Sequence, residues 1–369
     1  MSNIHGVAAQ GQSIWMDEIS RQLLEPEGLA ALVEGAAVTG VTSNPTIFAN
    51  AIMRSTDYDE AMRDLVGRDA DTIEIYTALI TRDIRDACDA LKPVWQKSGG
   101  ADGFVSVEVS PELANETEAT IREARDWWKR VDRPNLLIKV PATPAGIPAV
   151  RQLIGEGISV NVTLIFSLER YQEVMNAYLA GLETYAQTGG DLSRINSVAS
   201  FFVSRVDTEV DNRLGRIGTE GALALRGKAA IANARAAYGL FLETFAGERW
   251  ESLSSRGARI QRPLWASTST KDPAYPDTMY VDQLVAADTV NTVPVKTIEA
   301  YQDHGNPHPT VFGPVEIADA NTTLEKLESV GIAYNDVVQV LEDEGVQKFA
   351  DSYRELLDSI DQKRVAIKG

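Results

Sequence analysis

The stretch that decides the fold is NLLIKVPATPAGIPAV, which runs from Asn135 to Val150. Its first half, LLIKVP, has the apolar character of a buried strand but carries one lysine, Lys139. In its second half, Thr143 and Pro144 can serve as the N-cap and the first residue of a helix that leaves the strand. A strand that runs directly into a helix is typical of parallel sheets, and this one places Lys139 near the carboxyl end of its strand.

The same alternation of strand and helix recurs along the whole chain. We expect eight strands, at 13–17, 40–44, 103–110, 135–141, 159–166, 195–203, 263–268 and 289–295. Helical patterns separate most of them, for example at 112–128, 168–188, 206–245 and 322–360. The gap between the second and third strands has room for at least two helices, at about 47–64 and 70–96.

Eight strands that alternate with helices predict a parallel sheet, which is either open and doubly wound or closed into a (β/α)8 barrel. The open sheet usually carries a glycine-rich phosphate loop, and the chain has neither G-x-G-x-x-G after a strand nor G-x-x-x-x-G-K-[ST]. We therefore expect an α/β fold, a single (β/α)8 TIM barrel with additional helices. All 369 residues form this one domain, with residues 1–11 as a short N-terminal extension and residues 301–369 as closing C-terminal helices.

Composition and charge narrow the classes of partner and site. A formal net charge of −18 repels nucleic acid and anionic membranes, so neither is expected as a partner. The chain has no apolar run of about 18 residues, and its start lacks the regions of a signal peptide. Cys88 is the only cysteine, so no internal disulfide can form and a cytoplasmic location is expected.

Histidine is scarce, since the chain has only His5, His304 and His308. A metal site built on cysteine and histidine is therefore not expected. Two of the histidines lie in DHGNPHP (303–309), where the glycine and prolines predict a loop rather than a helix. The sequence does not set the oligomeric state.

Polar residues near the carboxyl ends of the strands are in phase with one another. Successive strand residues point to opposite faces, so that Leu136, Ile138 and Val140 face the helices and Lys139 points into the barrel. The same reasoning brings further polar side chains inward or to a strand end: Asp17, Thr42, Asn44, Ser106, Glu108, Asn161, Thr163, Ser200 and Ser267. Carboxyl strand ends line the active sites of such barrels, so we expect these side chains to form one.

A lysine inside a barrel indicates Schiff-base chemistry. Desolvation disfavours the charged form of a lysine, and the neutral amine can attack a carbonyl. The protonated imine makes an adjacent C–C bond breakable, and Asp17 and Glu108 can move the protons. The alternative is that Lys139 is only an architectural partner of one of these carboxylates. Because seven strands present polar groups, each costing roughly 2–7 kcal/mol if buried without a partner, we favour catalysis.

At these residues the chain resembles the transaldolase family. VTSNPTIF, the strand with Glu108, LIKVPAT and GISVNVTLIFS resemble the signature blocks of that family in the same order and with similar spacing, and WMDEISR and SFFVSRVD add to the match. The resemblance covers roughly residues 12–300. It implies a barrel without metal or organic cofactor that moves a three-carbon dihydroxyacetone unit between sugar phosphates. The donor would be sedoheptulose 7-phosphate or fructose 6-phosphate, and the acceptor glyceraldehyde 3-phosphate or erythrose 4-phosphate, in the non-oxidative pentose phosphate pathway.

The resemblance also implies roles for single residues. Lys139 would form the Schiff base, Glu108 with Thr163 and a bound water would handle protons during carbinolamine formation and loss, and Asp17 would take the proton from the C4 hydroxyl of the donor. The dihydroxyacetone unit would be bound by the remaining residues of the motifs: Asn44 and Asn161 through its hydroxyls, Thr42 and Ser200 near them, and Phe202 as an apolar wall.

The phosphate of the substrate needs cations. Arg205 matches the phosphate-binding arginine of the family, and the alternative is a solvated arginine at the start of the next helix. Where many members carry Ser-x-Arg after the seventh strand, this chain reads WASTSTKDP. We infer that Ser267 binds the phosphate and that Lys271 supplies the second charge, and the alternative for Lys271 is an ordinary surface lysine.

Two rival functions stay open. The related fructose-6-phosphate aldolases release free dihydroxyacetone, but they are shorter and tend to have glutamine at the position of Glu108 and tyrosine at that of Phe202. A sugar-phosphate-binding protein without catalysis would have no need of Lys139, both carboxylates and Thr163 together. These features favour an enzyme that transfers the unit.

Overall fold

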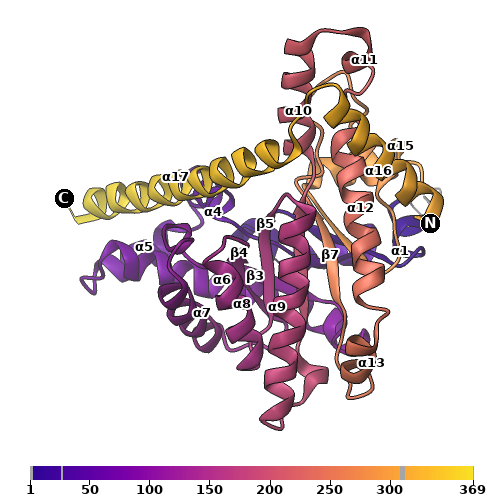
Figure 1. Cartoon of the computed structure of the whole chain (residues 1–369). Coiled ribbons are helices and arrows are strands. Elements are labelled where there is room, and N and C mark those ends of the chain that lie inside the picture. Colours follow the sequence, from indigo (N-terminus) through magenta and orange to yellow (C-terminus); the bar gives the residue numbers. More distant parts are fainter. Residues whose placement is uncertain (1–2, 26–27, 308–311, 369) are drawn as a thin grey trace.

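Eight parallel strands of the described residues close into a barrel in chain order, with β8 hydrogen-bonded to β1 (Figure 1). The structure is a computed structural model that describes residues 3–25, 28–307 and 312–368. The strands are β1 (Gln12–Met16), β2 (Val38–Val41), β3 (Phe104–Glu108), β4 (Leu136–Pro141), β5 (Val160–Ile165), β6 (Ser197–Phe202), β7 (Gln261–Ala266) and β8 (Thr289–Val293). The predicted (β/α)8 barrel is confirmed, and each strand overlaps the stretch expected for it.

Helices follow the strands and surround the barrel (Figure 1). Up to β5 they are α1 (Asn3–Ala8), α2 (Arg21–Leu24), α3 (Leu29–Ala36), α4 (Pro45–Arg54), α5 (Asp59–Val66), α6 (Thr72–Lys97), the 3-10 helix η1 (Pro111–Leu113), α7 (Thr117–Val131) and α8 (Gly146–Gly155). After β5 they are α9 (Leu168–Gln187), η2 (Leu192–Arg194), α10 (Ser204–Ile217), α11 (Glu220–Leu223), α12 (Ala229–Thr244), α13 (Glu248–Ser254), α14 (Met279–Gln283), α15 (Val295–His304), α16 (Pro314–Ser329) and α17 (Tyr334–Lys368). Over the part of the chain that is described, no helix has the length and apolar character needed to span a membrane.

The interior of the barrel is partly polar, and its polar groups are paired across strands. Every residue of β3, β4 and β5 is buried, because helices cover the outer face and side chains fill the inner one. Asn161 donates a hydrogen bond to the Ser106 hydroxyl (3.0 Å), and Gln261 donates one to the Ser197 hydroxyl (2.8 Å). These bonds offset the cost of burying polar groups, so the polar interior is compatible with a stable fold.

The helix after β4 begins later than the sequence predicts. Thr143 and Pro144 were expected as N-cap and first helical residue, and this prediction is wrong: α8 begins at Gly146, with Ala145 as its N-cap. The Thr143 hydroxyl instead donates to the Ala114 carbonyl, in the loop that follows η1, and accepts from the Gly146 backbone N–H (3.0 Å). Thr143 therefore ties the two loops together before the helix starts.

Other helix limits also differ from those expected. The pattern at 206–245 is divided into α10, α11 and α12, and that at 322–360 into α16 and α17. Gly218 and Gly331 interrupt them with φ of 70° and 100°, which glycine adopts without the penalty that other residues carry. The pattern at 112–128 becomes a helix only from residue 117, since residues 111–113 form η1.

The 35-residue helix α17 closes the carboxyl end of the barrel. It packs against α4, α5, α6 and α10 and reaches β5, and its far end projects beyond the other helices (Figure 1). At the opposite terminus, α1 packs against α15 and β1. Residues 1–2, which belong to the expected N-terminal extension, and His308 and Pro309 of the expected loop lie outside the described residues. The expected loop begins later than predicted, because α15 extends through Asp303 to His304.

Candidate active site

Lys139 lies inside the barrel, between two polar residues of the neighbouring strands. In the strand register its partners are Glu108 on β3 and Asn161 on β5. Its side chain is buried, and its Nζ lies 3.4 Å from Glu108 Oε2 and donates a hydrogen bond to the Ser43 carbonyl (3.2 Å). At 3.4 Å the contact with Glu108 is an ion pair rather than a short hydrogen bond. The amine therefore keeps donors available for a further partner.

Glu108 is a carboxyl group whose proton is poised near neutral pH. Burial raises the pKa of Glu108 to about 7, although the nearby Lys139 lowers it, and Asp17 adds a smaller rise. Within the described residues, neither carboxylate oxygen of Glu108 has a hydrogen-bond partner, nor does the Thr163 hydroxyl. Acceptor and donor sites beside Lys139 are thus open to a bound molecule.

Asp17 directly follows β1 and is oriented by two threonines in series. Thr42 contacts Asp17, and Thr292 contacts Thr42. The Thr42 hydroxyl, just past β2, donates to Asp17 Oδ1 (2.8 Å). Because that hydrogen is used, the 2.8 Å contact between Thr42 and Thr292 of β8 must be donated by Thr292. This chain of hydroxyls orients the carboxylate from behind.

The two expected asparagines are both anchored. Asn44 is the N-cap of α4, where its Oδ1 accepts from the Ile47 backbone N–H (3.0 Å), so its amide nitrogen is not used in that bond. Asn161 is fully buried, donates to Ser106 Oγ and accepts from the Ser200 hydroxyl at 2.7 Å. Both amides are therefore fixed in orientation by the barrel itself.

A cavity of about 200 Å³ lies above Lys139 at the carboxyl end of the barrel. Ten of the twelve residues to which the sequence assigns a catalytic or binding role line it: Asp17, Thr42, Asn44, Lys139, Thr163, Ser200, Phe202, Arg205, Ser267 and Lys271. The other two, Glu108 and Asn161, are buried beneath this lining and contact it through Lys139 and Ser200. Residues from seven strands or their following loops thus converge on one small volume.

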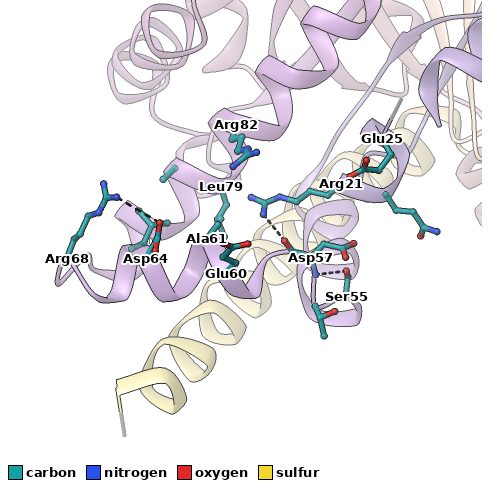
Figure 2. A pocket seen from close by; sticks show the side chains of 14 residues that line it. Arg21, Glu25, Ser55, Asp57, Glu60, Ala61, Asp64, Arg68, Leu79 and Arg82 are labelled. Atoms are coloured by element: carbon teal, nitrogen blue, oxygen red, sulfur yellow. Dashed lines mark hydrogen bonds and ion pairs between the residues drawn. The ribbon is translucent and has the colours of Figure 1, made fainter. Parts of the chain in front are cut away.

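A larger hollow of about 1050 Å³ lies outside the barrel, beside α2, α5 and α6 (Figure 2). Figure 2 shows charged side chains along its sides, where Arg21 donates to the Asp57 carbonyl (2.8 Å) and Arg68 pairs with Asp64 (4.0 Å). None of the twelve expected residues lines it. It is therefore a less suitable candidate for catalysis than the smaller cavity.

Two cations face the cavity from one side. Arg205, in the first turn of α10, lies over the Phe202 ring with its Cζ 5.3 Å from the ring centroid. Burial lowers the pKa of Arg205, and within the described residues its Nη1 has no hydrogen-bond partner. Burial, and then the charge of Arg205, lower the pKa of Lys271, although its side chain is exposed at the rim. Two cations of which one disfavours the charge of the other form a site suited to an anion.

Hydroxyl groups complete this cationic side. Lys271 Nζ donates to the Ser269 hydroxyl at 2.7 Å, and the Ser267 and Ser204 hydroxyls lie 2.9 Å apart. The loop after β7 is shaped to present them, since Ser267 has a φ of 57°, in the left-handed region that non-glycine residues rarely adopt. Oxygen and nitrogen donors therefore surround one end of the cavity.

Some lining residues were not expected from the sequence. Thr292 lies in β8, and its position near the end of a strand with alternating polarity is a signal that could have identified it. Phe349 comes from α17, where it occupies one of the regularly spaced apolar positions that also include Leu341, Tyr353 and Leu356. Such spacing is the ordinary pattern of a packed helix, so nothing in it indicated a residue of the site.

Over the described ranges no group of three or more His, Cys, Asp or Glu side chains is arranged to hold a metal ion. His304 pairs with Asp277, with its Nε2 2.8 Å from Asp277 Oδ1, at the surface.

Comparison with known proteins identifies the family. The family model described as Transaldolase/Fructose-6-phosphate aldolase matches residues 14–360. A curated protein named Transaldolase from Thermobifida fusca is 54% identical over 366 residues, covering 99% of this chain and 99% of its own length. Transaldolase from Mycobacterium ulcerans is 53% identical over 97% of this chain and 96% of its own length, and Transaldolase 1 from Streptomyces avermitilis is 53% identical over 98% and 95%. The chain therefore belongs to the transaldolase/fructose-6-phosphate aldolase family of enzymes.

Proposed function

We propose that this chain is a transaldolase that moves a dihydroxyacetone unit through a Schiff base on Lys139, in the pentose phosphate pathway. The donor is sedoheptulose 7-phosphate or fructose 6-phosphate, and the acceptor is glyceraldehyde 3-phosphate or erythrose 4-phosphate. The observation that supports this most directly is the position of Lys139: its amine is buried, lies 3.4 Å from Glu108 and lines the same cavity as Arg205 and Lys271. The reaction as proposed uses no metal or organic cofactor.

In the first steps, Lys139 attacks the C2 carbonyl of the ketose phosphate. The carbonyl oxygen takes up a proton to give a carbinolamine, which then loses water to form the protonated imine. A carboxyl group with a pKa of about 7 both gives and takes protons near neutral pH, which supports Glu108 in this role. The Thr163 hydroxyl, unpaired within the described chain, is suited to relay the proton.

The carbon–carbon bond then breaks between C3 and C4. Asp17 takes the proton of the C4 hydroxyl, the aldose phosphate leaves, and the bonding electrons pass to the imine nitrogen to give an enamine. The enamine attacks the aldehyde of the acceptor, and Asp17 returns the proton to the new hydroxyl. Thr42, which donates to Asp17 Oδ1, keeps the carboxylate oriented for both transfers.

The substrate is anchored at both ends in this proposal. Asn44, Asn161 and Ser200 lie on the side of the dihydroxyacetone hydroxyls, with Thr42 beside Asp17. At the other end Arg205, Lys271 and Ser267 bind the phosphate. A cation that is partly desolvated binds a phosphate more strongly than one in water, which supports this assignment for Arg205.

Borohydride trapping tests the covalent step. Reduction in the presence of fructose 6-phosphate should add the mass of a reduced dihydroxyacetone or hexose unit to the peptide that carries Lys139. The variant Lys139→Met, with a side chain of similar length and no amine, should show no adduct and no turnover. An adduct on another lysine, or none on the wild type, would remove the proposed mechanism.

Product analysis separates transfer from simple aldol cleavage. With fructose 6-phosphate alone, a transaldolase should release only one molecule of glyceraldehyde 3-phosphate per active site. Addition of erythrose 4-phosphate should start steady turnover, because the acceptor removes the enamine. Steady release of free dihydroxyacetone without an acceptor would identify an aldolase instead.

A further inference from the structure

Phe349 is the contribution of α17 to the cavity. All other lining residues that the structure describes come from the strands and the loops or helix starts that directly follow them. Phe349 is buried, with 5% of its surface exposed. It lies far from Lys139 in the sequence, because α17 comes after all the strands of the barrel. A residue so far along the chain reaches the site only because α17 crosses the barrel end (Figure 1).

The ring of Phe349 contacts both ends of the proposed substrate site. Its centroid lies 5.5 Å from Lys139 Nζ and 5.8 Å from Arg205 Cζ. Arg205 also lies over Phe202, so the guanidinium is held by two aromatic rings. Within the described chain, Arg205 Nη1 has no hydrogen-bond partner, and the two rings pack against its guanidinium, while the charges of Glu344 and Asp17 favour its charged form.

The ring is firmly seated. Phe349 lies one helical turn before Tyr353, which makes an edge-to-face contact with Tyr76 of α6 at 5.5 Å between centroids. Helix α17 also contacts α4, α10 and β5. A ring that is packed on several sides keeps its position when a ligand enters. Because the ring is apolar, it offers water no hydrogen-bond partner in the cavity.

We propose that Phe349 is a specificity-determining residue that retains the three-carbon unit on Lys139 and aims Arg205 at the phosphate of the acceptor. This proposal rests on the Schiff-base transfer proposed above. The ring covers Lys139 on the α17 side and reduces access of water to the enamine. By holding Arg205 against Phe202, it also favours an acceptor that carries a phosphate over one that does not.

The two fates of the enamine show what the wall controls. In transfer, the enamine carbon forms a bond to the acceptor aldehyde, and the aldehyde oxygen takes a proton from Asp17. In release, the enamine carbon takes a proton instead. Water then adds to the iminium carbon, and the C–N bond breaks with a proton to nitrogen, which gives free dihydroxyacetone and the Lys139 amine. Hydrolysis of the iminium takes up one water in both cases, because the new ketose phosphate is freed from Lys139 in the same way. The two fates differ in whether the enamine carbon takes up a proton, so a site that keeps water and other proton donors from this carbon favours transfer.

The test compares Phe349→Leu and Phe349→Ala with the wild type. Fructose 6-phosphate is supplied with and without erythrose 4-phosphate, and both free dihydroxyacetone and transfer product are measured. For Phe349→Ala the ratio of release to transfer should rise about tenfold. The KM for erythrose 4-phosphate should rise about threefold, while that for unphosphorylated glyceraldehyde changes little. Phe349→Leu keeps most of the packing volume and should lie between the two.

Leu356→Ala is the matched control, because it removes buried apolar packing from the same helix but does not line the cavity. It should lower the melting temperature and leave both the release ratio and the preference for the phosphorylated acceptor unchanged. An equal change in Leu356→Ala, or no change in either Phe349 variant, would overturn the proposal. Failure of borohydride to label Lys139 in the wild type would instead refute the proposed function, so the two failures are distinguishable.

Discussion

At the scale of single residues, the site depends on a buried acid and a buried amine that share a small space. Burial favours the uncharged form of Glu108, whereas the nearby Lys139 favours its charged form. With the pKa of Glu108 at about 7, neither tendency dominates near neutral pH. The proton can therefore pass between the pair and a substrate without a large cost in free energy.

The first prediction concerns Glu108 and stability. Its folded-state pKa of about 7 lies above the ordinary value of 4.5, so between these values the folded protein binds a proton that the unfolded chain lacks. The stabilisation of the fold that comes from this protonation is fully present below pH 4.5. It is lost as the pH rises through about 7. From about pH 6 to about pH 8 the wild type should lose about 1 kcal/mol relative to Glu108→Gln, as measured by urea unfolding.

The same variant tests catalysis. Glu108→Gln should lower kcat by about 10²–10⁴, because an amide cannot exchange a proton. It should do so with little change in the melting temperature at acidic pH, where the wild-type carboxyl is also neutral. If the stability difference between the two proteins were the same at both pH values, Glu108 would not carry the raised pKa.

The second prediction concerns the phosphate end of the cavity. Arg205→Met and Lys271→Met should each raise the KM for fructose 6-phosphate, by about tenfold or more for the buried Arg205 and less for the exposed Lys271. Steady-state kinetics should compare phosphorylated with unphosphorylated acceptors. Loss of a phosphate-binding cation should raise the KM for the phosphorylated acceptor only. An unchanged KM in Lys271→Met would mean that this residue is an ordinary surface lysine.

Most of the site could be predicted residue by residue, for a physical reason. Strand alternation fixes which side chains point inward, and a polar residue in such a position is conspicuous because apolar residues are the default there. Lys139, Thr163 and Ser200 were identified in this way, and all three line the cavity. Phe349 could not be identified, because an apolar residue on an amphipathic helix looks the same whether it meets the core or a substrate.

At the scale of elements, α14 and the loop between β7 and α14 are fastened to α10. The Tyr280 hydroxyl donates to Asp207 Oδ2 (2.8 Å), and the Tyr275 hydroxyl donates to Asp211 Oδ2. Burial raises the pKa of Asp207 to about 6, and its Oδ1 accepts from the Ala230 backbone N–H (2.8 Å). The first turn of α10 holds Arg205, and the loop after β7 holds Lys271. These bonds therefore connect the two segments that carry the cations of the proposed phosphate site. These contacts would thus brace the substrate site.

The third prediction tests this bracing. Tyr275→Phe removes one hydroxyl and leaves the ring, so the loop that bears Lys271 should lose order. The KM for phosphorylated substrates should rise about threefold with kcat nearly unchanged. Tyr178→Phe is the matched control: its hydroxyl donates to the Arg259 carbonyl (2.7 Å), just before β7 at the amino end of the barrel. That variant should lower stability without affecting KM, and equal KM effects in the two variants would contradict the idea.

The elements differ in how well their limits could be predicted. Strands were placed to within a few residues because each is a short apolar run between polar turns. Helix ends were placed less well, because apolar spacing can continue through a break. The spacing in 206–245 runs past Gly218, where the backbone turns left-handed and α10 stops. The start of α8 was also misjudged, since the Thr143 hydroxyl has a tertiary partner in Ala114 that no local rule reveals.

At the scale of the whole molecule, the negative charge is large and unbalanced. The chain has 53 acidic and 35 basic residues, and a net charge of −18 at pH 7. Self-repulsion of this kind weakens the folded state, and salt screens it. Each surface ion pair, such as that of Arg249 with Glu183 at 2.6 Å, joins one positive to one negative charge and so leaves the excess unchanged.

The fourth prediction follows from this charge. Raising NaCl from about 20 mM to about 500 mM at neutral pH should raise the melting temperature by a few degrees, as followed by circular dichroism. Near the isoelectric point of about 4.7 the net charge vanishes, and the same addition should have little effect or lower the melting temperature through the ion pairs. A fall in melting temperature with salt at neutral pH would mean that attractive pairs outweigh the net repulsion.

The barrel as a whole was predictable, whereas the course of its last helix was not. Regular alternation of strands and helices leaves few topologies, and the absence of a glycine-rich phosphate loop favoured the closed one. The path of α17 depends on contacts with α4, α6 and α10, which are distant in sequence. Local pattern carries no information on such docking.

The position of Phe349 in the last helix has a consequence for synthesis on the ribosome. All eight strands, with Lys139 and both carboxylates, leave the exit tunnel before α17 does. A nascent barrel at that stage would hold a reactive amine without its aromatic wall, and sugars that reached it would meet open solvent. The substrate pocket is therefore complete only after α17 has been made and has docked on the barrel.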